Sequence, residues 1–257
     1  MIDSRIPIVH SFPELEKMRV LLSADLHTDS SHFNEKSWKV FEDELNVPNT
    51  FVIFAGDQFE MALERSKSSH YESRMTPREA RDWMVEHLRP HKDKVLCLID
   101  GNHDYRMTRE TSFFPNYDLC CILRIEERYR SEGAFVDVGV GRQTHGGSNG
   151  KPFRYIFRVN HKAQNLVNFG TADGFEGIDI FVCGHTHKPQ DRPLGKLVYD
   201  PNHKFVTERN VENFVCGSFL RYGGYGERGG YRPTAHKMYA VHLNGTKKEI
   251  RTEGFSL

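Results

Sequence analysis

The sequence predicts an α/β fold, and three observations lead to this class. Short apolar runs recur along the chain and are continuous rather than alternating, which suits strands that are buried on both faces. Helical patterns lie between these runs, and the strand–helix–strand alternation over residues 20–100 is typical of a layered α/β fold. From about residue 133, strand patterns and long loops dominate. The predicted strands include residues 20–22, 51–54, 95–99, 134–138, 153–159, 178–183, 214–217 and 238–243.

Two helices are predicted between the first strands. Trp38, Phe41 and Leu45 have the i, i+3, i+7 spacing of a buried helix face. A second helix is predicted to start at residues 76–79, where the sequence Thr-Pro-Arg-Glu combines a capping box with a proline in the first helical position. We expect this helix to end before Pro90.

The composition is that of a globular protein without an overall electrostatic preference. The 257 residues suffice for one large domain over residues 1–257. Basic and acidic residues both number 35, so we expect no stable complex with nucleic acid and no attraction to an anionic membrane. No apolar run approaches a membrane span, and the N-terminus has no signal-peptide pattern. Five cysteines without a C-x-x-C pair favour a cytoplasmic protein with reduced thiols, and the oligomeric state stays open.

Polar side chains of metal-binding type follow four of the predicted strands. Ligands bind at the carboxyl ends of strands in open α/β sheets, so these side chains can converge on one crevice. In an Asp-x-His or His-x-His sequence both side chains point the same way, because the side-chain period of a strand is two. Carboxylate and imidazole ligands together suit Mn, Fe, Zn, Ni or Co. The strand-end residues are Asp25 and His27; Asp57; Asn102, His103 and Asp104; and His185 and His187.

The motifs Asp-x-His, Gly-Asp, Gly-Asn-His-Asp and Gly-His-Thr-His, in this order, resemble those of the calcineurin-like metallophosphoesterases. The resemblance covers about residues 18–250 and is nearest to the small bacterial and phage phosphoesterases. It implies a four-layer α-β-β-α sandwich, with two mixed sheets flanked by helices. It also implies a site for two divalent metal ions, for which we expect Mn²⁺ first and Fe, Zn, Ni or Co as alternatives.

The family pattern assigns the ligands residue by residue. By resemblance, Asp25, His27 and His187 bind one metal, Asp57 bridges, and Asn102 and His185 bind the second metal. The family has one further histidine ligand, for which two candidates exist. We favour His161, because it follows the predicted strand, over His145, which lies in a Thr-His-Gly-Gly loop typical of many members. Lys162 stands where the family usually has a glycine after this histidine.

The chemistry of such a site is hydrolysis of phosphoric esters. Two ions can lower the pKa of a bridging water and present hydroxide to phosphorus. His103 is expected to donate a proton or hydrogen bond to the leaving oxygen, and Asp104 to orient His103. Asn102, His103 and Arg221 are candidates for substrate binding. Arg221 belongs to an Arg/Tyr/Gly-rich loop, residues 221–232, which either lines the substrate cleft or is a plain surface loop.

Three functions compete for this sequence. The first is a metal-dependent phosphoesterase that acts on small phosphodiesters, with monoesters slower. The second is a nuclease similar to the recombination nucleases of the family, which the zero net charge argues against. The third is a non-catalytic scaffold with the same fold, which the full set of ligands argues against. We therefore expect a hydrolase whose partner is a small phosphate ester.

Overall fold

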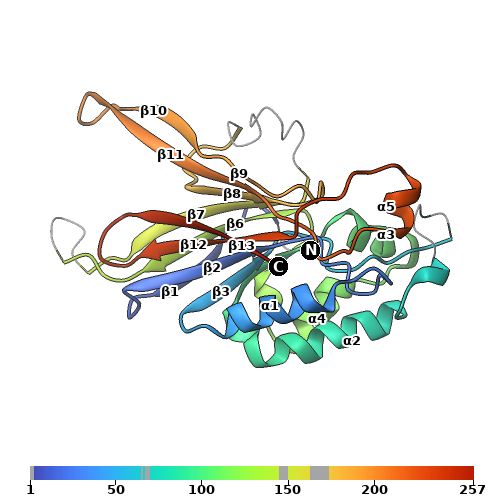
Figure 1. Cartoon of the computed structure of the whole chain (residues 1–257). Coiled ribbons are helices and arrows are strands. Elements are labelled where there is room, and N and C mark those ends of the chain that lie inside the picture. The colour runs from blue at the N-terminus through green and yellow to red at the C-terminus, as the bar shows by residue number, and fades with distance from the viewer. Residues whose placement is uncertain (1–2, 65, 67–69, 145–149, 163–173) are drawn as a thin grey trace.

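The computed structural model describes the chain except residues 1–2, 65, 67–69, 145–149 and 163–173, and it consists of two mixed sheets with helices (Figure 1). One sheet has seven strands in the order β1-β6-β7-β8-β11-β10, with β9 paired to β11. The other has six strands in the order β13-β12-β2-β3-β4-β5. The predicted α/β class with two mixed sheets is therefore confirmed.

The eight predicted strands are present, and the described part of the chain contains five further strands that the sequence did not predict. Their bounds are β1 Ile8–Phe12, β2 Lys17–Ser23, β3 Thr50–Phe54, β4 Val95–Ile99, β5 Tyr129–Arg130, β6 Gly133–Val140, β7 Phe153–Asn160, β8 Ile180–Cys183, β9 Gln190–Asp191, β10 Leu194–Asp200, β11 Phe205–Val215, β12 Lys237–Asn244 and β13 Ile250–Ser256. Apolar side chains from both sheets form one buried cluster, which includes Val20, Leu22, Val136 and Phe157. The two sheets therefore share a core.

The longer helices pack on the outer face of the six-stranded sheet (Figure 1). They are α1 Glu35–Asn46, α2 Pro77–Leu88, α3 Asn102–Thr111 and α4 Pro115–Leu123; α5 Gly224–Arg228 is a short helix, and 3-10 turns cover His70–Glu72, Arg89–Lys94 and Glu126–Arg128. In the part of the chain that is described, the buried cluster on the outer face of the seven-stranded sheet contains no residue of these helices. No helix among the described residues is long and apolar enough to cross a membrane.

The helix signals in the sequence have the expected structures. Thr76 Oγ1 accepts a hydrogen bond from Glu79 N, and the Glu79 carboxylate accepts one from Thr76 N at 2.8 Å, so the capping box is formed. Two helices were not predicted. Helix α3 begins at Asn102, and the loop expected at residues 221–232 contains the helix α5.

The topology explains where the polar strand ends meet. Strands β2, β3 and β4 are neighbours and parallel in the six-stranded sheet, while β7, β8 and β11 are parallel in the seven-stranded sheet. The residues that follow β2 and β3 bond directly to one another, because Asp25 N donates to Gly56 O and His27 N to Asp57 O. Within the seven-stranded sheet, Gly184 N donates to His161 O, and across the two sheets Phe219 N donates to Asp25 O. The loops that carry the candidate ligands therefore form one connected edge.

Candidate metal centre

The structure brings the predicted ligands together in adjoining groups. Two groups contain six of them: Asp25, His27 and His187, and Asp57, His161 and His185. A third group consists of His27, Glu60 and His103, so His27 belongs to two groups. Within each group the possible ligand atoms all lie within 4.8 Å of one another. The groups combine loops after β2, β3, β7 and β8 with the first turn of α3.

The backbone at this edge is strained in the way expected of a functional site. Left-handed φ angles are uncommon for residues other than glycine and concentrate at such sites. In the described chain, half of the non-glycine residues with such angles are predicted ligands: Asp25 (φ 54°), His27 (φ 50°), Asp57 (φ 54°), His185 (φ 74°) and His187 (φ 57°). This backbone turns the chain sharply after each strand, and the polar side chains leave the strand ends at the edge where the two sheets meet.

Close approach explains the glycines of the Gly-Asp and Gly-Asn motifs. A Cβ atom at Gly56 would lie 2.6 Å from His161 Nδ1, and φ there is +94°. A Cβ atom at Gly101 would overlap the Asp57 carboxylate. Any larger residue would therefore displace a candidate ligand.

Hydrogen bonding presents the His161 imidazole to the site through Nε2. Its Nδ1 lies 2.9 Å from the carbonyl oxygen of Ala55, which fixes the proton on Nδ1. Its Nε2 lies 3.0 Å from Asp57 Oδ2. Burial lowers the pKa of His161, but the Asp57 carboxylate raises it more, to about 9. A proton thus occupies the position at which a cation would be bound, and the two would compete.

The first group shows a similar convergence. His27 Nε2 and His187 Nε2 lie 3.4 Å apart, and His187 Nε2 lies 3.4 Å from Asp25 Oδ1. The Asp25 carboxylate also accepts hydrogen bonds from the backbone N–H of His185 at 2.9 and 3.0 Å. Burial raises the pKa of Asp25, but His187 lowers it more, so the carboxylate is ionised. A buried carboxylate and two imidazole nitrogens facing one point are a suitable donor set for a divalent ion.

Asn102 completes the donor set of the second group. Its side-chain Oδ1 is buried and has no hydrogen-bond partner among the described residues. The next residue, His103, donates its backbone N–H to Asp57 Oδ1 at 2.8 Å, which holds the start of α3 against Asp57. Buried polar atoms normally have a partner, and a bound cation would supply one here. The residues present therefore fit two divalent ions.

Glu60 is a site residue that sequence reasoning missed. Its carboxylate lies 2.8 Å from His27 Nδ1 and 3.2 Å from His103 Nδ1. Burial raises the pKa of Glu60, but its contacts with His103 and His27 lower it well below the usual value. The available signal was its position three residues after Asp57, in the same loop.

Asp104 has a different place from the one expected. We predicted that it orients His103, but its carboxylate accepts hydrogen bonds from the backbone N–H groups of Asp57, Gly101 and Phe59. The carboxylate at His103 Nδ1 is that of Glu60. The expected role of Asp104 is therefore corrected. It ties the loop after β3 to the start of α3.

Arg221 and His145 are two further site residues predicted from the sequence. The described contacts of Arg221 are with the loop at residues 31–32: its guanidinium donates to the Ser31 carbonyl oxygen at 3.1 Å. Its role in substrate binding stays a prediction. His145 lies outside the described residues.

We expect the change His161→Ala to remove the second metal ion and His145→Ala to leave it bound. The reason is the position of His161 Nε2, 3.0 Å from Asp57 Oδ2. Metal content per chain and anomalous scattering from crystals of both variants measure the result. A second ion that persists in His161→Ala and disappears in His145→Ala would show that His145 is the ligand.

Comparison with known proteins identifies the family of the chain. No curated protein sequence matches the chain. Among solved structures, it is similar to a predicted phosphoesterase from Streptococcus pneumoniae TIGR4 (14% identity, 94% of this chain and 98% of that chain, TM-score 0.39). Others are the calcineurin-like phosphoesterase YfkN from Bacillus subtilis (11%, 94% and 91%, TM-score 0.43) and a metallophosphoesterase from Sphaerobacter thermophilus (12%, 93% and 89%, TM-score 0.41). The family model for calcineurin-like phosphoesterases matches residues 18–189, and the chain belongs to this family.

Proposed function

We propose that the protein is a dinuclear metal-dependent hydrolase that cleaves small phosphodiesters and, more slowly, monoesters. The observation that carries this proposal is the pair of adjoining ligand groups with His103 beside them. We propose Mn²⁺ as the metal, with Fe, Zn, Ni or Co as alternatives. Asp25, His27 and His187 would hold one ion, Asp57, Asn102, His161 and His185 the other, with Asp57 shared. Such ions, when bound at these residues, would supply activation of water and neutralisation of phosphate charge.

His103 is placed to protonate the leaving oxygen. Its Nε2 lies 3.9 Å from Asp57 Oδ2, and 22% of its side chain is exposed, so a substrate can reach it. Burial lowers the pKa of His103, but Glu60 and Asp57 raise it more, to about 9, which keeps the imidazole protonated at neutral pH. The Nδ1 proton faces Glu60, and the Nε2 proton is left for the leaving group.

We expect His103→Ala to lower kcat by about 10²–10⁴-fold, the usual contribution of a general acid, while both ions stay bound. Steady-state kinetics on a diester and metal analysis of the same sample measure the two effects. A variant that loses an ion would instead make His103 a ligand. The group that His103 forms with His27 and Glu60 would then be the site of that ion.

We expect Glu60→Gln to lower kcat by about 10–100-fold, the range for residues that orient ligands and catalytic groups. The amide keeps the shape of Glu60 but loses the charge that holds His27 and His103. Glu42→Gln is the matched control, because Glu42 pairs with His87 at 2.7 Å away from these groups. Equal activity of the two variants would remove Glu60 from the mechanism.

The central test is a substrate panel with protein purified in Mn²⁺. We expect about two ions per chain and the fastest turnover on bis-p-nitrophenyl phosphate or a cyclic nucleotide, slower turnover on p-nitrophenyl phosphate, and little on duplex DNA. Full activity with a single ion would overturn the dinuclear proposal. Fast, salt-sensitive cleavage of duplex DNA would overturn the small-substrate proposal and favour a nuclease.

The proposed setting is the cytoplasm, without a stable nucleic-acid or membrane partner. All five cysteines are free, as is usual for proteins in a reducing compartment. Basic and acidic residues balance at 35 each, whereas a duplex-binding surface neutralises several phosphates with Lys and Arg. The substrate is therefore proposed to be small.

A further inference from the structure

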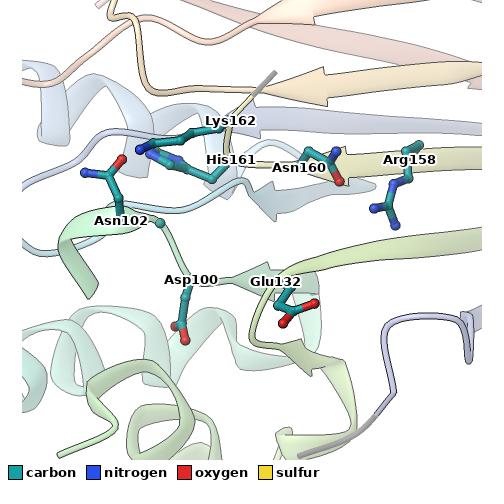
Figure 2. A pocket seen from close by; sticks show the side chains of 8 residues that line it. Asp100, Asn102, Glu132, Arg158, Asn160, His161 and Lys162 are labelled. Carbon is teal, nitrogen blue, oxygen red and sulfur yellow. The ribbon is translucent and has the colours of Figure 1, made fainter. Parts of the chain in front are cut away.

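A pocket of about 320 Å³ adjoins the metal centre and shares Asn102 and His161 with it. Its remaining lining comes from the start of α3, the connection between β5 and β6, and the end of β7: Asp100, Gly101, Glu132, Arg158, Asn160 and Lys162. Figure 2 shows Asn102, His161 and Lys162 grouped at one end of the pocket and Arg158 at the other. A group bound at Asn102 and His161 therefore has room beside it in the direction of Arg158.

Arg158 and Asn160 lie on the same side of β7. Strand residues two apart share a face, so Arg158 and Asn160 leave β7 on the opposite side from the buried Val159. A Cβ atom at Gly133, on the neighbouring strand, would lie 2.6 Å from Asn160 Oδ1 and 3.1 Å from the Arg158 guanidinium. The absence of a side chain at Gly133 therefore leaves the space into which these two side chains extend.

Among the described residues, aromatic rings rather than a carboxylate hold the Arg158 guanidinium. It lies over the rings of Phe135 and Phe175, at 4.6 and 4.8 Å from their centroids. Its Nε is buried and has no hydrogen-bond partner in the described part of the chain. Burial lowers the pKa of Arg158. Two aromatic contacts fix the plane of the cation and leave its N–H edge for an acceptor.

The lining of the pocket carries two basic side chains, Arg158 and Lys162, and two acidic ones, Asp100 and Glu132. The Asp100 carboxylate is engaged elsewhere, because it accepts hydrogen bonds from Tyr129 and Asn116 and points away from Lys162 in Figure 2. Glu132 is exposed, so water screens its charge. Arg158 is therefore the charged side chain of the lining best placed to bind an anion at the end of the pocket away from the metal centre.

We propose that Arg158 forms a subsite for a second phosphate group of the substrate. The inference rests on the proposed phosphodiesterase function and narrows its substrate class. Arg158 lies three residues before His161, which corresponds to about 10 Å of extended chain. The second phosphate is therefore separated from the scissile one by a spacer of about the size of a sugar, as in a nucleoside bisphosphate. Arg158 makes the bidentate contact that guanidinium groups form with phosphate.

The test compares two substrates that differ in one group: the p-nitrophenyl ester of thymidine 5′-monophosphate and the same ester with a 3′-phosphate. In the wild-type protein we expect a higher kcat/KM for the 3′-phosphorylated ester. Arg158→Gln is expected to lower the ratio of the two kcat/KM values by about tenfold or more, as loss of a charged hydrogen bond does. Arg154→Gln, on the same strand and paired with Asp137, is the matched control and keeps the wild-type ratio.

A second measurement does not depend on turnover. Calorimetry with thymidine 3′,5′-bisphosphate and thymidine 5′-monophosphate should show tighter binding of the bisphosphate to the metal-loaded protein, and loss of that advantage in Arg158→Gln. Arg158→Lys keeps the positive charge but not the planar fork that binds phosphate, and it should retain only part of the advantage. Diester hydrolysis with a wild-type ratio in both Arg158 variants would overturn the subsite and leave the proposed function intact. Selective bisphosphate binding without hydrolysis of either ester would retain the subsite and overturn the function.

Discussion

Replacing Asp57 with Asn is expected to abolish phosphoesterase activity and to lower the metal content of the protein. Asp57 is buried, and it lies at the junction of the ligand groups: Oδ2 is 3.0 Å from His161 Nε2 and Oδ1 accepts a hydrogen bond from His103 N. The amide has nearly the same shape but carries no charge and only one acceptor oxygen. Substitution of a residue that only orients a ligand already lowers activity by about 10–100-fold. For Asp57→Asn we therefore expect activity to fall by more than about 100-fold.

The measurements for Asp57→Asn are metal ions per chain, activity and the far-ultraviolet circular dichroism spectrum. The spectrum should be unchanged, because the strands that carry the fold do not depend on this side chain. Asp179→Asn is a suitable control, since Asp179 is a buried carboxylate whose partners are Arg209 and Lys248 rather than the metal ligands. Wild-type turnover and two bound ions in Asp57→Asn would show that Asp57 is not shared between the metals.

The control also separates two kinds of loss. If Asp179→Asn lowers stability but keeps its ions, burial of a carboxylate by itself does not explain the effect at Asp57. The difference between the two variants then measures what the position of Asp57 beside His161 contributes.

The sequence predicted which side chains meet at this site more completely than it predicted their surroundings. Asp25, His27, Asp57, His185 and His187 follow strands directly, so a strand pattern and a metal-binding residue type sufficed to find them. Glu60 was not predicted as a site residue, because its position there depends on contacts with His27 and His103 from other segments of the chain. The spacing of these residues in the sequence does not reveal the contacts.

The same limit applies to the fold. Continuous apolar runs indicated the strands of both sheets, because burial on two faces leaves a local signal. The pairing order, with β2 between β12 and β3, joins residues more than 200 positions apart and has no local signal. The start of α3 was also missed, since its N-cap is Gly101 and the following Asn-His-Asp is equally typical of a turn.

The change Asp104→Ala is expected to destabilise the protein by about 3–5 kcal/mol. Asp104 is fully buried, and its two oxygens accept hydrogen bonds from three backbone N–H groups, those of Asp57, Gly101 and Phe59, at 2.8, 2.8 and 3.1 Å. Alanine leaves these donors without a partner, and each buried unsatisfied donor costs about 1–3 kcal/mol. Burial and the nearby carboxylates of Asp57 and Asp100 raise the pKa of Asp104. Alanine removes the repulsion between these carboxylates, so we expect the loss of stability to lie at the lower end of the summed cost of the three donors.

Urea unfolding of Asp104→Ala, Asp104→Asn and the exposed control Asp43→Ala measures this expectation. Asn retains one acceptor oxygen and should cost less than Ala, while Asp43→Ala removes a surface pair with Lys39 and should change stability by less than about 1 kcal/mol. Because Asp104 fastens Asp57 to the helix that begins at Asn102, metal content should fall together with stability in Asp104→Ala. A stable variant with full metal content would show that the ligand loops hold their positions without this carboxylate.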